Sequence, residues 1–189
     1  MKLNSEFYKV AVKACADVYK NNTDLGTTEF RHAIKTINGR RYQVLAIAGT
    51  NEWKDWLINI NLFSRKGIKY GAYKAAKDIN EKLRRYKGLP LLVCGHSKAG
   101  ATAIAFKRLF GAEYCIAFAP ARSIRPWAKK EMENTVLFID PDDIVSKLAF
   151  ISFTHPICTV IKAREDHDFY SIGDHKMKHW IEFVSKMVD

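Results

Sequence analysis

Ser97 is the residue of this chain best placed to act as a nucleophile, because of what flanks it. It follows an apolar run at residues 91–94 and precedes an Ala-rich segment of helical composition. A strand, a sharp turn and a helix with serine at the apex form a nucleophile elbow, whose strained turn exposes the hydroxyl. Such a turn needs small neighbours, and Gly95, Ala99 and Gly100 provide them. The pattern predicts a serine hydrolase, with a plain Gly-Ser turn as the alternative.

A catalytic serine needs a general base, usually a histidine that a carboxylate orients. In hydrolases with an elbow of this kind, these partners follow in the order Ser, Asp, His. The apolar run 136–139 leads into three carboxylates, Asp140, Asp142 and Asp143. Asp143 precedes an apolar pair, which favours an inward orientation. We therefore predict Asp143 as the acid, and Asp140 and Asp142 stay open as alternatives.

Several histidines are candidates for the base. His175 opens the last predicted helix and follows the last predicted strand, where the chain order expects the base. His179 lies one turn further along and would share the same helix face. His167 stands in a charged loop, His155 stands near the start of a strand, and His96 lies within the elbow itself. We therefore predict His175 as the base.

Ester hydrolysis also needs hydrogen-bond donors for the oxyanion of the intermediate. The backbone N–H of Lys98, directly after the nucleophile, is one predicted donor. The second should come from a loop after another strand end. The apolar run 46–48 ends in a glycine turn, and Thr50 in that turn is the predicted second donor.

These residues need a framework that brings strand ends together. Predicted strands and helices alternate, which is typical of an α/β fold with a mostly parallel central sheet and helices on both faces. Ligands bind at the carboxyl ends of the strands of such a sheet. A hairpin at 30–37 and 42–48 turns at Asn38-Gly39. The further predicted strands are 91–94, 114–118, 136–140 and 157–161, and the predicted helices are 52–60, 72–86, 98–109 and 174–187.

Six segments, at residues 48–56, 69–73, 95–101, 118–122, 143–145 and 174–175, resemble motifs of the class 3 lipases in the same order. They are similar to that family's oxyanion loop, His-x-Gly-Phe segment, Gly-His-Ser-Leu-Gly-Gly-Ala elbow, Phe-Gly-x-Pro-Arg strand end, Asp-x-Val turn and terminal histidine. The family comprises fungal triacylglycerol lipases and plant and bacterial phospholipases A1. The resemblance implies an α/β-hydrolase-like fold and a Ser97, Asp143, His175 triad. It also implies Thr50 and Lys98 as oxyanion donors, with no cofactor and no metal.

The chain departs from the family pattern near the predicted nucleophile. Lys98 replaces a leucine and puts a cation beside Ser97, while Ala99 and Ala48 replace a glycine and an arginine. The segment at the position of the lid, residues 61–69, is very short and basic. A long amphipathic lid is therefore not expected.

The size of 189 residues predicts a single domain over 1–189, with an amphipathic helix at 5–20 packed on it. Charged residues interrupt the first 19 residues, so no signal peptide is expected. No apolar run approaches the roughly 20 residues that span a bilayer. The four cysteines form no Cys-x-x-Cys pair and sit in apolar runs, which indicates reduced thiols. We predict a cytoplasmic protein, although export by another route stays open.

A net charge of +11 indicates an anionic partner, such as phospholipid head groups, nucleic acid or an acidic substrate, and a solvated, solubilising surface stays open as the alternative because the basic residues are dispersed. The leading hypothesis is a serine ester hydrolase of lipase or phospholipase type that acts on lipid or small esters through an acyl-enzyme. The charge and Lys98 favour anionic phospholipid over neutral triglyceride, with peripheral contact to an anionic membrane. The alternative is a non-catalytic domain that binds membranes or nucleic acid, and nucleic acid is the less favoured partner. Acyl length, head group and oligomeric state stay open.

Overall fold

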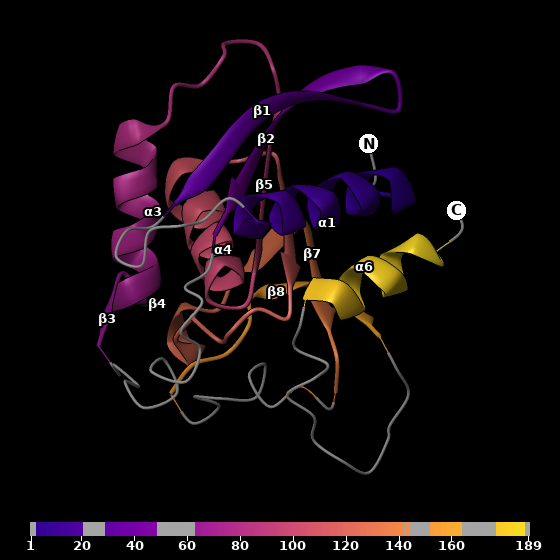
Figure 1. The fold of residues 1–189 in the computed structure, drawn as a ribbon. Coiled ribbons are helices and arrows are strands. Elements are labelled where there is room, and N and C mark those ends of the chain that lie inside the picture. The colour runs from indigo at the N-terminus through magenta and orange to yellow at the C-terminus, as the bar shows by residue number, and fades with distance from the viewer. Residues whose placement is uncertain are drawn as a thin grey trace.

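A central sheet of six strands, in the order β1-β2-β5-β6-β7-β8, organises the protein (Figure 1). The computed structural model describes residues 3–20, 29–48, 63–141, 143, 152–163 and 177–187. Strand β1 is antiparallel to β2, and each following neighbour is parallel. This is the mostly parallel sheet that the sequence predicts. The strands are β1 (Phe30–Ile37), β2 (Arg40–Ile47), β5 (Leu91–His96), β6 (Tyr114–Phe118), β7 (Glu131–Ile139) and β8 (Ile157–Lys162).

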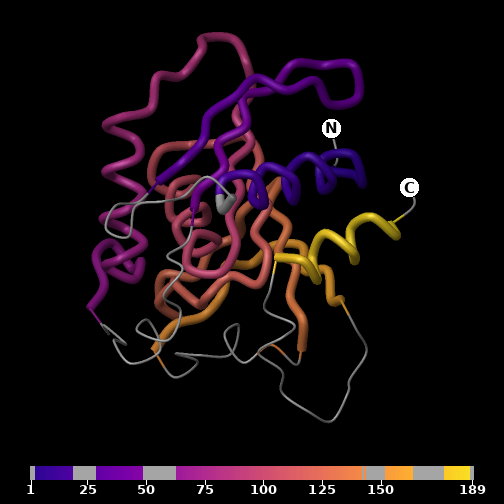
Figure 2. The backbone as a smooth tube through the Cα atoms, viewed as in Figure 1, coloured from indigo at the N-terminus to yellow at the C-terminus, as the bar shows by residue number. Residues whose placement is uncertain are grey.

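Helices cover both faces of the sheet, so the predicted α/β-hydrolase-like fold class is confirmed (Figures 1 and 2). On one face, α3 (Tyr70–Lys82) and α4 (Lys98–Phe110) bury their apolar sides against alternate strand residues. On the other face, α1 (Ser5–Lys20) and α6 (Met177–Ser185) pack on the remaining strand residues. Because successive side chains of a strand point to opposite faces, the central strands contribute to both cores.

The central strands are continuous apolar runs because they are covered on both sides. Every residue of β5 and of β6 is buried. The predicted run 91–94 extends through His96, and Ser97 follows directly. Strand β7 begins at Glu131, before the predicted start at 136, because Glu131 pairs with Ile157 of β8 ahead of a register shift.

The hairpin of β1 and β2 turns at Asn38 and Gly39, as predicted. Both residues have positive φ, at 49° and 74°, which a type I′ turn requires. The predicted helix 72–86 instead ends at Lys82. The buried side chain of Gln43 binds the segment that follows. The Tyr86 N–H donates to Gln43 Oε1 at 2.7 Å, and Gln43 Nε2 donates to the Tyr86 carbonyl at 2.9 Å. The predicted helix 52–60 lies outside the described residues.

The basic segment expected at the lid position forms a small hairpin over the residues described there. It consists of β3 (Ser64–Arg65) and β4 (Ile68–Lys69). A Cβ at Gly67 would lie 2.1 Å from the Ala128 Cβ, so the turn packs closely on the short helix η1 (Pro126–Ala128). The Arg125 N–H donates to the Gly67 carbonyl at 2.8 Å. Among the described helices, none is long and apolar enough to cross a membrane.

Candidate active site

Ser97 lies in a strained turn between β5 and α4. Its φ of 59° and ψ of −126° belong to a region that residues other than glycine rarely adopt, at an expense of about 1–3 kcal/mol. The Ser97 N–H donates to the Phe118 carbonyl at 2.9 Å. The Ser97 carbonyl accepts from the N–H groups of Ala101 at 3.2 Å and Ala121 at 3.3 Å. Hydrogen bonds from β6, α4 and the following loop therefore hold the strained conformation.

The glycines around Ser97 are needed for close approach. A Cβ at Gly95 would lie 2.4 Å from the Ala99 carbonyl oxygen, a distance that no side chain tolerates. A Cβ at Gly100 would lie 3.0 Å from the Pro120 Cβ and 3.2 Å from the Gly95 carbonyl oxygen. The strand, the helix and the loop after β6 thus converge at Ser97, which gives the small residues of the sequence a physical reason.

Two of the three candidate acids lie at the carboxyl end of β7. Asp140 and Asp143 are both fully buried, and the Asp143 N–H donates to the Asp140 carbonyl at 3.1 Å. Strands β5 and β7 flank β6 in parallel, so these carboxylates and Ser97 lie at the same edge of the sheet. Asp142 lies outside the described residues.

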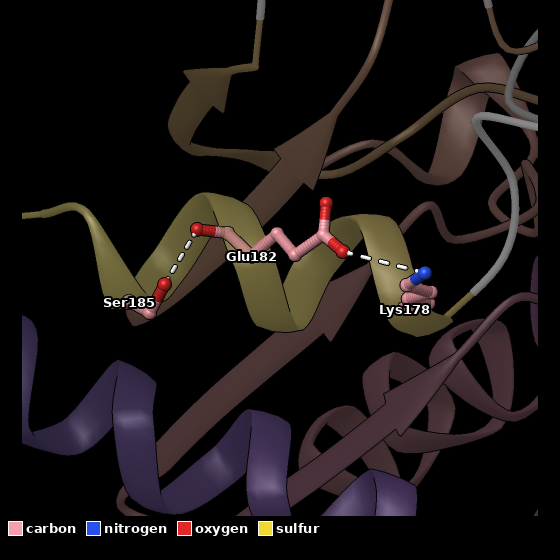
Figure 3. A network of polar contacts seen from close by, with 3 residues as sticks. All are labelled: Lys178, Glu182 and Ser185. Atoms are coloured by element: carbon pink, nitrogen blue, oxygen red, sulfur yellow. Dashed lines mark hydrogen bonds and ion pairs between the residues drawn. The ribbon is translucent and has the colours of Figure 1, made fainter.

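The structure brings one of the alternative histidines to one of the alternative acids. His179 on α6 places its Nε2 3.3 Å from Asp140 Oδ2, and its side chain is only 16% exposed. The Trp180 ring packs edge-on to the imidazole at 5.0 Å. The sequence placed His179 on a helix face but gave no sign of its pairing with Asp140. Figure 3 shows other polar residues of α6, among them Lys178 and Glu182, whose mostly exposed side chains are 3.8 Å apart.

The other predicted participants are only partly described. His175 and Thr50 lie outside the residues that the structure describes, as does His167. His96 is the buried last residue of β5, and His155 is half-buried just before β8. Lys98 is the first residue of α4 and is half-buried, which leaves its backbone N–H next to the Ser97 turn.

Burial affects two lysines of this region, Lys69 and Lys98. Lys69, at the end of β4, is only 8% exposed, and burial together with the charge of Lys98 lowers its pKa below the ordinary value. Burial also lowers the pKa of Lys98. In the sequence, Lys69 stands out as one of the charges near the lid position and as the first residue of the segment 69–73, and neither feature indicates that its side chain is buried.

The thiols are poor candidates for a nucleophile. All four cysteines are free, and three of them are buried. Contact with Cys15 and burial raise the pKa of Cys94 well above its usual range, and burial raises the pKa of Cys158 to about 11. Since the thiolate is the reactive form, these groups are suppressed at neutral pH. In the described part of the chain, no cluster of His, Cys, Asp and Glu side chains forms a metal site.

Comparison with solved structures places the fold among lipases. The Lip2 lipase of Yarrowia lipolytica superposes with a TM-score of 0.62 at 12% identity, over 84% of this chain and 78% of that one. A nonglycosylated form of the same lipase gives a TM-score of 0.62 at 11% identity, over 87% and 82% of the two chains. A Rhizomucor miehei lipase–propeptide complex gives 0.57 at 12% identity, over 84% of this chain and 65% of that one.

This chain therefore spans just under two thirds of the Rhizomucor protein and about four fifths of the Yarrowia protein. No family model matches the sequence, and no curated protein matches it either. At identities this low, the similarity establishes a lipase-like fold.

Proposed function

We propose that the protein is a serine carboxylic ester hydrolase of lipase type. The observation that carries this proposal is the strained backbone of Ser97, with φ 59° and ψ −126°, between a buried strand and a helix. A fold retains such strain where function requires it. The lipase-like fold and the buried Asp143 at the same edge of the sheet support the same conclusion.

The proposed mechanism proceeds through an acyl-enzyme. Ser97 Oγ attacks the ester carbonyl while His175 accepts its proton, and Asp143 stabilises the imidazolium that forms. The backbone N–H groups of Thr50 and Lys98 stabilise the oxyanion of the tetrahedral intermediate. His175 then protonates the leaving alcohol. A water molecule, deprotonated by His175, attacks the acyl carbonyl, and His175 then gives that proton to Ser97 Oγ as the carboxylic acid leaves.

His175 is preferred to His179 as the base for two reasons. It follows the last strand, where the chain order of the resembling family puts the catalytic histidine. His179 Nε2 already lies 3.3 Å from Oδ2 of the fully buried Asp140, a contact between α6 and the end of β7. Replacement of each histidine separates the two assignments: His175→Ala should abolish hydrolysis, whereas His179→Gln should retain it.

The proposed substrates are lipid esters at an anionic surface. Phe63 and Trp127 are 78% and 76% exposed; Phe63 lies at the open end of the hairpin, where its carbonyl accepts the Tyr70 N–H, and Trp127 lies against Gly67 at the turn. Arg65 and Lys66 of that hairpin are exposed as well. Tryptophan favours the membrane interface, and each basic residue near an anionic surface contributes about 1 kcal/mol. We therefore propose peripheral contact with anionic lipid through this aromatic and basic hairpin surface (Phe63, Arg65, Lys66 and Trp127).

Hydrolysis of p-nitrophenyl esters of graded chain length tests the proposed function. Ser97→Ala should lower kcat/KM by at least about 10³-fold, because the nucleophile is lost. Ser185→Ala, which removes an exposed hydroxyl from α6, is the matched control and should retain full activity. Equal activity of wild type and Ser97→Ala would refute the proposal. Salt-sensitive nucleic-acid binding without hydrolysis would favour the non-catalytic alternative.

A further inference from the structure

We propose that strand β8 is the contact surface between two copies of this chain, which join their sheets through antiparallel pairing of β8 with β8. The inference goes beyond the proposed function, and it can be tested by measuring assembly without any ester. It rests on the outer edge of the sheet, on the side chains that β8 presents there, and on the way in which two identical strands align.

Strand β8 is the last strand of the sheet, and its outer edge offers hydrogen-bonding groups. Its inner neighbour is β7, and no described strand pairs with β8 on the other side. The N–H groups of Ile157 and Ala163 donate to carbonyls in and just before β7, at 3.2 and 3.1 Å, so the odd-numbered residues face β7. Because the backbone groups of successive strand residues point to opposite sides, those of Cys158, Val160 and Lys162 face outward. Such a row is a template for a further strand.

The side chains of β8 leave this edge unprotected. Ile157 and Val160 are 51% and 46% exposed, and no charged residue precedes Lys162 in the strand. Proteins often protect a sheet edge with charged side chains, and β1, at the opposite edge, has the exposed residues Arg31 and Lys35. The two edges of the same sheet therefore differ, and β8 is the one on which another chain can pair.

The alignment of identical strands favours a second copy as the partner. Opposed residues of an antiparallel pair either both face the partner strand or both face away from it, so the outward row of one copy must meet the same row of the other. A two-fold axis at Val160 puts Val160 opposite Val160, Cys158 opposite Lys162, and Thr159 opposite Ile161. Within this ladder no two lysines meet, and β-branched residues form cross-strand pairs of the kind that stabilise sheets. Strand β8 is therefore complementary to itself.

The charge of the chain makes this assembly sensitive to salt. Each copy has a net charge of +11, so two copies repel one another, and salt screens the repulsion. Sedimentation equilibrium of the full chain should show monomers and dimers, with the dimer fraction rising as protein concentration and salt concentration rise.

Substitutions at Val160 test the pairing of β8. Val160→Pro removes an outward N–H and no bond to β7, a change that an edge strand tolerates, and Val160→Lys sets two cations against each other across the axis. The axis counts each change twice, so both variants should lower the association constant by at least about tenfold. Val160→Thr, which stays β-branched, should keep it. Ala33→Lys adds the same charge at an exposed position of β1 and is the matched control, which should also keep it.

Cross-linking locates the contact between the copies. In a hydrogen-bonded pair centred on Val160, the two Cα atoms lie about 5.5 Å apart, within the roughly 4.4–6.8 Å that a disulfide spans. Under a mild oxidant, Val160→Cys should therefore form a covalent dimer, whereas Ala33→Cys and the wild type should not.

Three results would overturn the inference. The first is a wild type that stays monomeric at every protein and salt concentration, which would leave β8 to a strand of a different protein. The second is a dimer that Val160→Pro and Val160→Lys leave intact. The third is equal cross-linking of Val160→Cys and Ala33→Cys.

Discussion

Ser97 combines a strained backbone with a full set of backbone hydrogen bonds, and this combination determines how its variants behave. At φ 59° a Cβ is unfavourable, whereas glycine adopts such a conformation freely. Glycine relieves the strain in the folded state but increases the entropy of the unfolded chain, and the first effect is the larger. Ser97→Gly should therefore be more stable than Ser97→Ala by about 1 kcal/mol. Urea unfolding of the two inactive variants measures the difference. Equal midpoints would mean that the turn carries no strain.

Gly95 offers a second prediction at the scale of single residues. Gly95→Ala forces a Cβ to 2.4 Å from the Ala99 carbonyl oxygen, so it should lower the free energy of unfolding by about 1–3 kcal/mol. Gly71→Ala is the matched control, because its Cβ would meet nothing within 4 Å near the start of α3. That variant should be neutral or stabilising by about 0.5–1 kcal/mol. A similar loss in both variants would contradict the close packing at the elbow.

The sequence revealed some of these residues and concealed others. The Ser97 turn was predictable because small residues cluster where strand and helix meet, and such turns have a fixed local chemistry. The burial of Lys69 was not predictable, because Lys69 contacts the loop after β6, about 50 residues later in the chain. The pairing of Asp140 with His179 was hidden for the same reason.

At the scale of elements, α6 is held on the sheet by one buried polar contact as well as by apolar packing. Asp140 is fully buried and faces His179 at 3.3 Å. His179→Gln should lower the free energy of unfolding by about 1–3 kcal/mol, because it weakens the compensation of a buried carboxylate. Thermal and urea unfolding measure the loss.

Lys178→Gln is the control on the same helix. It removes the ion pair with Glu182 in Figure 3, whose partners are mostly exposed, and should change stability by less than about 0.5 kcal/mol. If His179→Gln is as stable as wild type but loses hydrolysis as completely as Ser97→Ala, the base is His179 and the Asp140 pair is catalytic.

The elements themselves were largely predictable, and their ends were not. Apolar runs at β5 and β6 mark strands covered on both faces, so the sheet and its alternation with helices followed from the sequence. The end of α3 could not be predicted from the sequence, because the backbone of Tyr86 is hydrogen-bonded to Gln43 in a distant strand. Helix ends set by tertiary hydrogen bonds leave no local pattern.

At the scale of the whole molecule, the net charge of +11 and the aromatic and basic hairpin surface predict how the protein meets lipid. Sedimentation with phosphatidylglycerol vesicles should show binding that weakens as salt rises, because the charges are screened. Trp127→Ala should weaken binding several-fold by removing an interfacial aromatic ring. Tyr86→Ala, which removes another exposed aromatic ring, should not. Equal binding to neutral vesicles would contradict this prediction.

The central claim is that Ser97 is an activated nucleophile, and labelling with a fluorophosphonate tests it most directly. The probe forms a covalent bond only with a serine whose hydroxyl is activated. Mass spectrometry of the wild-type protein should find one adduct, on the peptide that contains Ser97, and Ser97→Ala should remain unlabelled. An unlabelled wild type, or an adduct that persists in Ser97→Ala, would contradict the claim.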